Sequence, residues 1–152
     1  MKIKAHPTKY KDVTFRSRLE ATWAAFFDLA GIKWQYEPID LEGWVPDFVL
    51  WLSSPVYVEV KPAPMEAMWP KGPVVLNGQF DGFDKAKKHW KDAWVLCVGI
   101  QPNEDADYFG LGMLMDHGHG EQSWFDMLDQ LRVQGAANKW AAAKSVTQWV
   151  TG

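Results

Sequence analysis

The chain has 152 residues, a formal net charge of −3 and a single cysteine, Cys97. This length is typical of one domain that buries a hydrophobic core without disulfides, so we expect a single domain over residues 1–152. One cysteine excludes an internal disulfide and favours a reducing cytoplasm. The sequence has neither an apolar run long enough for a membrane span nor a signal-peptide core, which favours a soluble cytoplasmic protein without a membrane partner.

The charges are unevenly distributed along the chain. Residues 1–18 hold six basic groups and one acidic group, whereas the remaining 134 residues hold ten basic and eighteen acidic groups. Residues 1–14 form a basic N-terminal arm, which we expect to be extended or irregular because His6-Pro7 disfavours helix. Such an arm suits nucleic-acid phosphates, although a short basic N-terminus is also often merely solvated. The candidate phosphate contacts here are Lys9, Lys11, Arg16 and Arg18.

A helical period of apolar residues covers residues 15–30 and stops at Gly31. Glu20 borders this apolar stripe, because it precedes Trp23 by three positions and therefore lies on nearly the same face. A carboxylate in that position needs a partner, which is either Arg16 one turn earlier or a metal ion.

Three strands are predicted after this helix. Residues 34–41 form the first strand, in which Glu37 either supports a nearby site or solvates the sheet edge. Residues 46–61 contain two alternating apolar runs around a Ser-Ser-Pro break, which predicts a β-hairpin. Because side chains alternate between the two faces of a strand, one face of this hairpin carries the ionisable residues Asp47, Glu59 and Lys61.

The hairpin is a candidate metal site. If its strands pair about Ser53 or Ser54, Asp47 lies opposite Glu59 or Lys61, at a Cβ separation of roughly 4.5 to 5.5 Å. Two carboxylates on an apolar sheet repel each other and lose hydration unless a cation compensates them. Oxygen ligands favour Mg²⁺ or Mn²⁺ over zinc.

A long proline-rich connection follows the hairpin over residues 62–80, and it is either a flap over a substrate groove or a surface loop that fills the core. Residues 81–91 are predicted to form a lysine-rich helix and residues 93–99 a strand. A lysine-rich helix is often only a solvated face, but phosphate charge beside the site favours contact with DNA. The candidate contacts in this helix are Lys85 and Lys88.

The rest of the chain has no evident chemistry. Residues 108–115 are a further strand or an irregular apolar segment, and residues 124–131 and 138–150 are amphipathic helices that we expect to cover the sheet. His117 and His119 are assigned to a loop because no third zinc ligand lies close by. Three of the ten tryptophans lie near the candidate site in sequence: Trp44, Trp51 and Trp69. We interpret them mainly as core residues. The alternative is that they stack on unpaired bases.

Four short motifs occur in order within the first 65 residues. They are Phe-Arg-Ser-Arg-Leu-Glu at residues 15–20, Tyr-Glu-Pro at 36–38, Pro-Asp-Phe at 46–48 and Val-Glu-Val-Lys at 58–61. At these positions the sequence resembles the PD-(D/E)XK nuclease superfamily and is similar to its small single-domain phage and bacterial members. The bare signature is short, but four motifs in order on the expected elements are much more specific.

The resemblance implies an α/β fold with a restriction-endonuclease-like core of helix, three strands, helix and strand, followed by C-terminal helices. It also implies a Mg²⁺- or Mn²⁺-dependent deoxyribonuclease that processes phage or bacterial DNA. Asp47, Glu59 and the backbone carbonyl of Val60 would hold the ion, and Glu20 would complete the shell directly or through water. Lys61 would orient the attacking water or stabilise the charge that develops on the phosphate.

Two other functions stay open from the sequence. One is a DNA-binding or assembly module that keeps the fold but does not cut, although the intact acid–acid–lysine set speaks against it. The other is the cleavage subunit of a transposition or restriction complex, in which a protein partner supplies the specificity that this chain has no second domain to provide.

Overall fold

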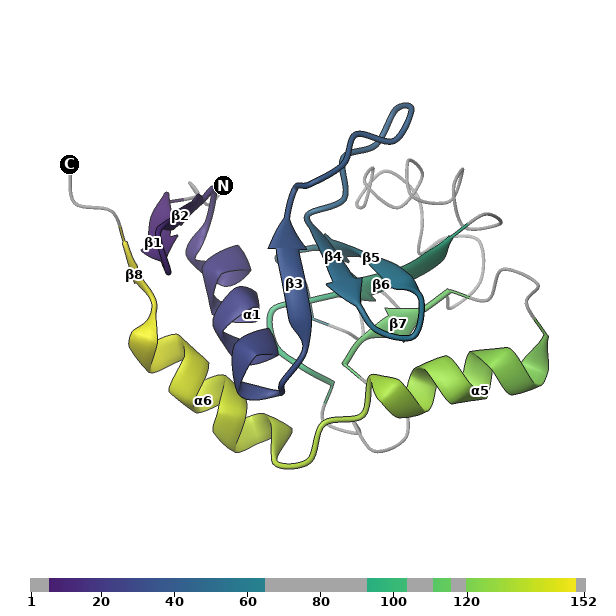
Figure 1. Ribbon diagram of the computed structural model, residues 1–152. Helices are drawn as coiled ribbons and strands as arrows, with labels where there is room; N and C mark the ends of the chain where they lie inside the picture. Colours follow the sequence, from purple (N-terminus) through teal and green to yellow (C-terminus); the bar gives the residue numbers. More distant parts are fainter. Residues whose placement is uncertain (1–5, 65–92, 104–110, 116–119, 150–152) are drawn as a thin grey trace.

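The computed structural model describes residues 6–64, 93–103, 111–115 and 120–149 (Figure 1). Its elements in chain order are β1 (Thr8–Tyr10), β2 (Val13–Phe15), α1 (Arg18–Leu29), β3 (Lys33–Tyr36), β4 (Phe48–Trp51), β5 (Pro55–Val60), β6 (Trp94–Val98), β7 (Met113–Leu114), α5 (Glu121–Gln130), α6 (Ala136–Val146) and β8 (Gln148–Trp149). None of the helices in these ranges is long and apolar enough to cross a membrane.

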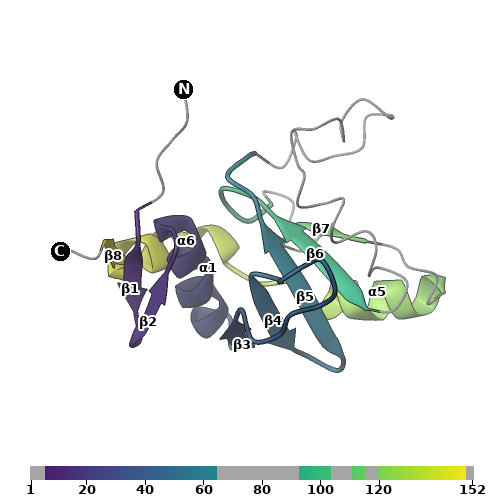
Figure 2. The same cartoon turned by 90° about the horizontal axis from the view of Figure 1, so that it is seen from above.

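A five-stranded mixed sheet in the order β3-β4-β5-β6-β7 forms the centre of the fold (Figures 1 and 2). β3, β4 and β5 are antiparallel neighbours, β5 pairs with β6 in parallel, and β7 runs antiparallel to β6. The α/β class is therefore confirmed. The predicted hairpin is also confirmed, because Phe48 pairs with Val58 and Trp51 with Pro55, which centres the turn on Ser53.

Local capping fixes where α1 begins. Ser17 is the N-cap, its hydroxyl accepts a hydrogen bond from the Glu20 backbone N–H at 3.2 Å, and it donates to Glu20 Oε1 at 3.0 Å. Because the Ser17 side chain caps the N–H of the third helical residue, the helix starts at Arg18 and not at Phe15, where the apolar period begins. The helix ends before Gly31, whose φ of 74° suits glycine at a helix terminus.

One face of the sheet and the helices α1, α5 and α6 bury a single core. Phe48 lies at its centre, since four aromatic rings lie within 6.0 Å of its own ring, centroid to centroid: Phe15, Phe27, Trp34 and Tyr36. The opposite face carries a smaller cluster formed by Trp44, Val95, Cys97 and Met115. The functional residues described below lie where these two clusters meet.

The two ends of the chain pair with each other in a second small sheet, ordered β2-β1-β8. The described part of the predicted N-terminal arm is thus a β-hairpin instead of an irregular segment. Its two-residue turn is Lys11-Asp12, with φ values of 49° and 63°, as a type I′ turn requires. The helix predicted over residues 138–150 is wrong at its end, because α6 stops at Val146 and β8 pairs with β1.

The other predicted elements differ mainly in their limits. The strand predicted over residues 34–41 ends at Tyr36, because Glu37 takes a φ of 46° and breaks the extended backbone. The strand at 93–99 and the helix at 124–131 are confirmed as β6 and α5, with α5 beginning three residues earlier. Three predictions lie outside the described residues: most of the 62–80 connection with Trp69, the helix bearing Lys85 and Lys88, and the His117–His119 loop.

We expect Phe48→Ala to lower the free energy of unfolding by about 3–5 kcal/mol, because it removes a fully buried ring from an aromatic cluster and leaves a cavity. Urea unfolding followed by tryptophan fluorescence measures this change. Leu29→Ala is the control, since Leu29 is exposed and its loss should cost less than about 1 kcal/mol. Equal losses in the two variants would show that Phe48 does not organise the core.

Candidate active site

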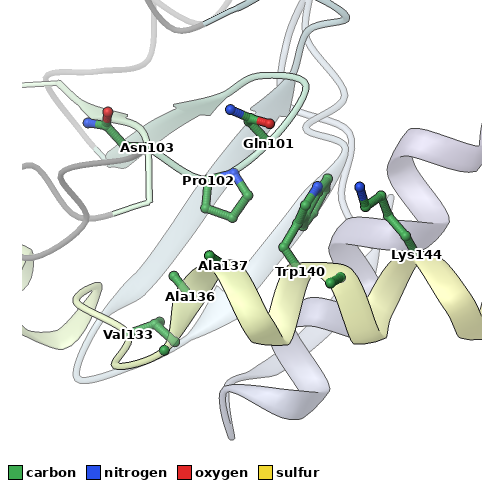
Figure 3. A pocket seen from close by; sticks show the side chains of 10 residues that line it. Gln101, Pro102, Asn103, Val133, Ala136, Ala137, Trp140 and Lys144 are labelled. Carbon is green, nitrogen blue, oxygen red and sulfur yellow. The ribbon is translucent and has the colours of Figure 1, made fainter.

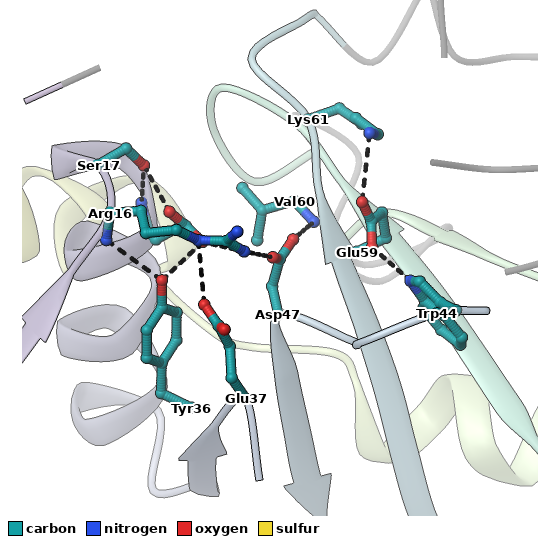
Figure 4. Close-up of polar contacts among 10 residues, drawn as sticks. Arg16, Ser17, Tyr36, Glu37, Trp44, Asp47, Glu59, Val60 and Lys61 are labelled. Carbon is teal, nitrogen blue, oxygen red and sulfur yellow. Dashed lines mark hydrogen bonds and ion pairs between the residues drawn. The ribbon is translucent and has the colours of Figure 1, made fainter. Parts of the chain in front are cut away.

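The site lies where β4 begins and β5 ends, beside the first turn of α1 (Figure 4). Asp47 precedes β4, and its backbone N–H donates to the Val58 carbonyl at 2.9 Å. The Val60 backbone N–H in turn donates to Asp47 Oδ2 at 2.7 Å. These two bonds hold Asp47 against the end of β5, in the neighbourhood of Glu59 that the predicted register requires.

Glu59 is buried on the sheet face opposite the helices. The indole N–H of Trp44 donates to Glu59 Oε2 at 2.7 Å, and Lys61 Nζ lies 3.2 Å from Glu59 Oε1. Sequence reasoning missed the role of Trp44, which it placed in the core. The residue is indeed buried, but its loop folds back through paired backbone bonds between Leu41 and Trp44, and this aims the indole N–H at Glu59.

Arg16 lies among three carboxylates. Its Nη2 is 3.2 Å from Asp47 Oδ1 and 3.9 Å from Glu20 Oε2, and its Nε is 3.0 Å from Glu37 Oε1. Arg16 was predicted as a phosphate contact and as one possible partner of Glu20. The structure adds Asp47 and Glu37 as its partners, and it resolves the alternatives for Glu37 in favour of support for the site.

Glu20 is buried in the first turn of α1 and is held chiefly by neutral donors. Ser17 Oγ donates to one carboxylate oxygen at 3.0 Å, and the Tyr36 hydroxyl donates to the other at 3.1 Å. Burial raises the pKa of Glu20, while the Ser17 hydrogen bond and the charge of Arg16 oppose that rise. Glu20 therefore borders the site as predicted, with hydroxyl groups on both of its oxygens.

Asp47 is the most electrostatically perturbed acid of this group. Burial, and then the charge of Glu59, raise the pKa of Asp47 to about 8, against the opposing effect of the Val60 N–H and Arg16. A carboxyl with this pKa is largely protonated near neutral pH unless a cation stabilises its charged form. The site thus favours the arrival of additional positive charge.

Asp47 and Glu59 have the same kinds of partner around their carboxylates. One oxygen of Asp47 accepts a hydrogen bond from the Val60 backbone N–H, and one oxygen of Glu59 accepts from the Trp44 indole N–H. The other oxygen of each faces a charged side chain, Arg16 or Lys61. Within the described residues, one oxygen of each carboxylate therefore faces a side-chain cation that another cation can replace.

Comparisons with protein-family models, curated proteins and solved structures found no match to this chain. The assignment of the site consequently rests on its own residues.

The donor set fits a hard divalent ion with few protein ligands. Within the described ranges, no group of three or more Asp, Glu, His or Cys side chains is placed so that it could hold a metal ion. Asp47 and Glu59 remain as candidate ligands, together with the backbone carbonyl of Val60, whose N–H donates to Asp47. Mg²⁺ is commonly held by one or two carboxylates plus waters and substrate phosphates, so this smaller set is sufficient for it.

The predicted phosphate contacts in residues 9–18 are largely engaged within the protein. Lys11 Nζ lies 3.0 Å from Asp28 Oδ2, and Arg18 Nη2 donates to the Lys144 carbonyl at 2.9 Å. Lys9 is exposed on β1. Of the four residues, Lys9 therefore best keeps the character of a surface phosphate contact.

A separate pocket of about 500 Å³ opens between α6 and residues 101–103 (Figure 3). Pro102, Val133 and Trp140 give it an apolar floor, and Gln101 and Lys144 lie at its rim. None of the acidic residues of the site lines it. The chemistry discussed here therefore belongs to the strand ends and not to this pocket.

The raised pKa of Asp47 predicts a pH-dependent stability. Between about pH 4 and pH 8 the unfolded chain releases the Asp47 proton while the folded protein keeps it, so folding stability falls as pH rises through this window. The slope from this group is at most about 1.4 kcal/mol per pH unit. We expect Asp47→Asn to gain stability relative to wild type as pH rises from 4 to 8, measured by urea unfolding in EDTA.

Asp40→Asn is the matched control, because Asp40 is an exposed acid in the loop before the site. Its stability difference from wild type should stay constant over the same pH range. A constant difference for Asp47→Asn as well would mean that Asp47 is not perturbed in the folded protein.

Proposed function

We propose that the protein is a Mg²⁺- or Mn²⁺-dependent nuclease that hydrolyses phosphodiester bonds in DNA on a restriction-endonuclease-like core. The observation that carries this proposal is the meeting of Asp47, Glu59 and Lys61 at adjoining strand ends, with two buried carboxylates whose outer oxygens face replaceable cations. The mixed sheet, with α1 beside its antiparallel strands and a parallel β5–β6 pair, supports the proposed core.

The residues have distinct parts in the proposed reaction. Asp47, Glu59 and the carbonyl of Val60 would hold the ion, and Glu20 would act through water. When bound, Mg²⁺ polarises the scissile phosphate and lowers the pKa of a bound water. Trp44 fixes the orientation of Glu59 through its 2.7 Å hydrogen bond. Lys61 is only partly exposed and adjoins Glu59, so its ammonium group is placed to orient the water or to stabilise charge on the phosphate.

A second candidate is a DNA-binding or assembly module that does not cut. One observation favours it: each of the four acids, Glu20, Glu37, Asp47 and Glu59, has a partner within the protein. Such a cluster is stable without a metal ion.

A third candidate shares the cutting chemistry but works as the cleavage subunit of a complex, with sequence choice supplied by a protein partner. Phage or bacterial DNA processing in the cytoplasm is the setting that we propose for either nuclease.

We expect the wild-type protein to cut DNA in Mg²⁺ or Mn²⁺ and to be inactive in EDTA. Linear, circular and branched DNA should be compared on gels, because cleavage of a circle identifies an endonuclease. Asp47→Asn should abolish cutting, since it removes a metal-binding charge at almost constant shape. Lys61→Ala should reduce cutting by roughly a hundredfold or more while metal binding persists, because a positioned charge acts on the water or phosphate.

Lys33→Ala is the control for Lys61→Ala, because Lys33 is an exposed lysine of β3 that pairs with Trp51 at the far end of β4. Its activity should equal that of wild type. DNA binding without cutting of any substrate in either metal would favour the second candidate. Cutting that survives in EDTA or in Asp47→Asn would contradict the proposed metal site.

A further inference from the structure

Arg16 has an unusual position for a residue of a cation-binding site. It belongs to the two-residue connection between β2 and α1, yet its Nη2 lies 3.2 Å from the Asp47 oxygen that the Val60 N–H leaves open. That oxygen is the one that a divalent ion on Asp47 would use. Arg16 and such an ion therefore compete for the same atom.

The rest of Arg16 is anchored independently of Asp47. Its Nε lies 3.0 Å from Glu37 Oε1, and its backbone N–H donates to the Tyr36 hydroxyl at 3.2 Å. The side chain is 65 % exposed, so Nη2 can turn away from Asp47 without being buried elsewhere. The pair joins an exposed guanidinium to a buried carboxylate, so Arg16 can leave Asp47 only when another cation, such as a divalent ion, takes its place.

We propose that Arg16 is an exchangeable cation of this site: it holds Asp47 Oδ1 in the metal-free protein, yields that oxygen to the divalent ion, and then binds a phosphate oxygen of the DNA. This proposal rests on the proposed nuclease function and adds a positioning residue to it. After the exchange, the Glu37 pair still holds the guanidinium at the site, with its Nη2 donor released. Arginine is well suited to the second step because its planar fork matches phosphate oxygens.

The first test measures Mn²⁺ binding to the full chain without DNA, by titration calorimetry. Because Arg16→Gln removes the competing cation, it should bind Mn²⁺ about three- to tenfold more tightly than wild type. Asp47→Asn should bind Mn²⁺ far more weakly, and adding Arg16→Gln to it should give no further gain. Arg132→Gln is the matched control, since Arg132 pairs with Asp129 on α5 and should leave the affinity unchanged.

The second test measures binding to a short DNA duplex in EDTA and in saturating Ca²⁺. In Ca²⁺, Arg16→Gln should bind DNA about three- to tenfold more weakly than wild type, because the variant lacks the guanidinium that contacts phosphate. In EDTA, Arg16→Gln and wild type should bind DNA nearly equally.

A third measurement needs no variant. The arginine side-chain ¹⁵N resonances of Arg16 in the wild-type protein should shift when Mg²⁺ saturates the site.

The outcomes separate this inference from the proposed function. If Mn²⁺ binding is lost in Asp47→Asn but is equal in wild type and folded Arg16→Gln, the metal site stands and the exchange is wrong. Arg16 resonances that do not move at saturating Mg²⁺ also overturn the exchange, even if Arg16→Gln fails to fold. If neither wild type nor Arg16→Gln binds Mn²⁺, both the metal site and the exchange are refuted.

Discussion

Two carboxylates buried beside each other at the junction of β4 and β5 are the constraint on which the arrangement of this protein depends. Neither Asp47 nor Glu59 is more than 8 % exposed, and burial of charge is costly unless hydrogen bonds and opposite charges compensate it. The compensating groups come from three segments of the chain: Arg16 before α1, Trp44 from the loop before β4, and Lys61 after β5. The acidic pair therefore ties the first helix, a loop and the central hairpin together.

The segment at residues 15–20 shows how the fold places these groups. Phe15 packs its ring 4.4 Å from Tyr36 and 6.0 Å from Phe48, so the core fixes the backbone just before Arg16. Ser17 then caps α1 by accepting from the Glu20 backbone N–H, and its hydroxyl donates to the Glu20 carboxylate. Apolar packing, charge compensation and helix capping thus alternate along six residues. A shift of one position would remove Arg16 from Asp47 or Ser17 from the helix end.

The sequence predicted those features that depend on local periodicity. Alternation of apolar residues and the Ser-Ser-Pro break were enough to predict the hairpin with its centre at Ser53 or Ser54, and the structure selects Ser53, which puts Asp47 beside Glu59. Long-range pairings were missed, since β8 joins β1 across most of the chain. The indole bond from Trp44 and the contacts of Arg16 with Asp47 and Glu37 depend equally on tertiary structure. In Glu37 a single positive φ shortened a predicted strand and turned an acid toward Arg16.

The acids of the site all have partners within the protein, but this does not by itself argue against a metal site. The partners of Glu20 differ in chemical nature from those of Asp47 and Glu59. Both oxygens of Glu20 accept hydrogen bonds from neutral hydroxyls, so this residue is satisfied without any exchange of ions. Asp47 and Glu59 each combine one fixed N–H donor with one side-chain cation. The fixed N–H donors satisfy one oxygen of each acid, and the side-chain cations supply the opposite charge that a buried carboxylate needs. In the metal site that we propose, this division lets the positive charge that stabilises the folded protein leave when a divalent ion binds.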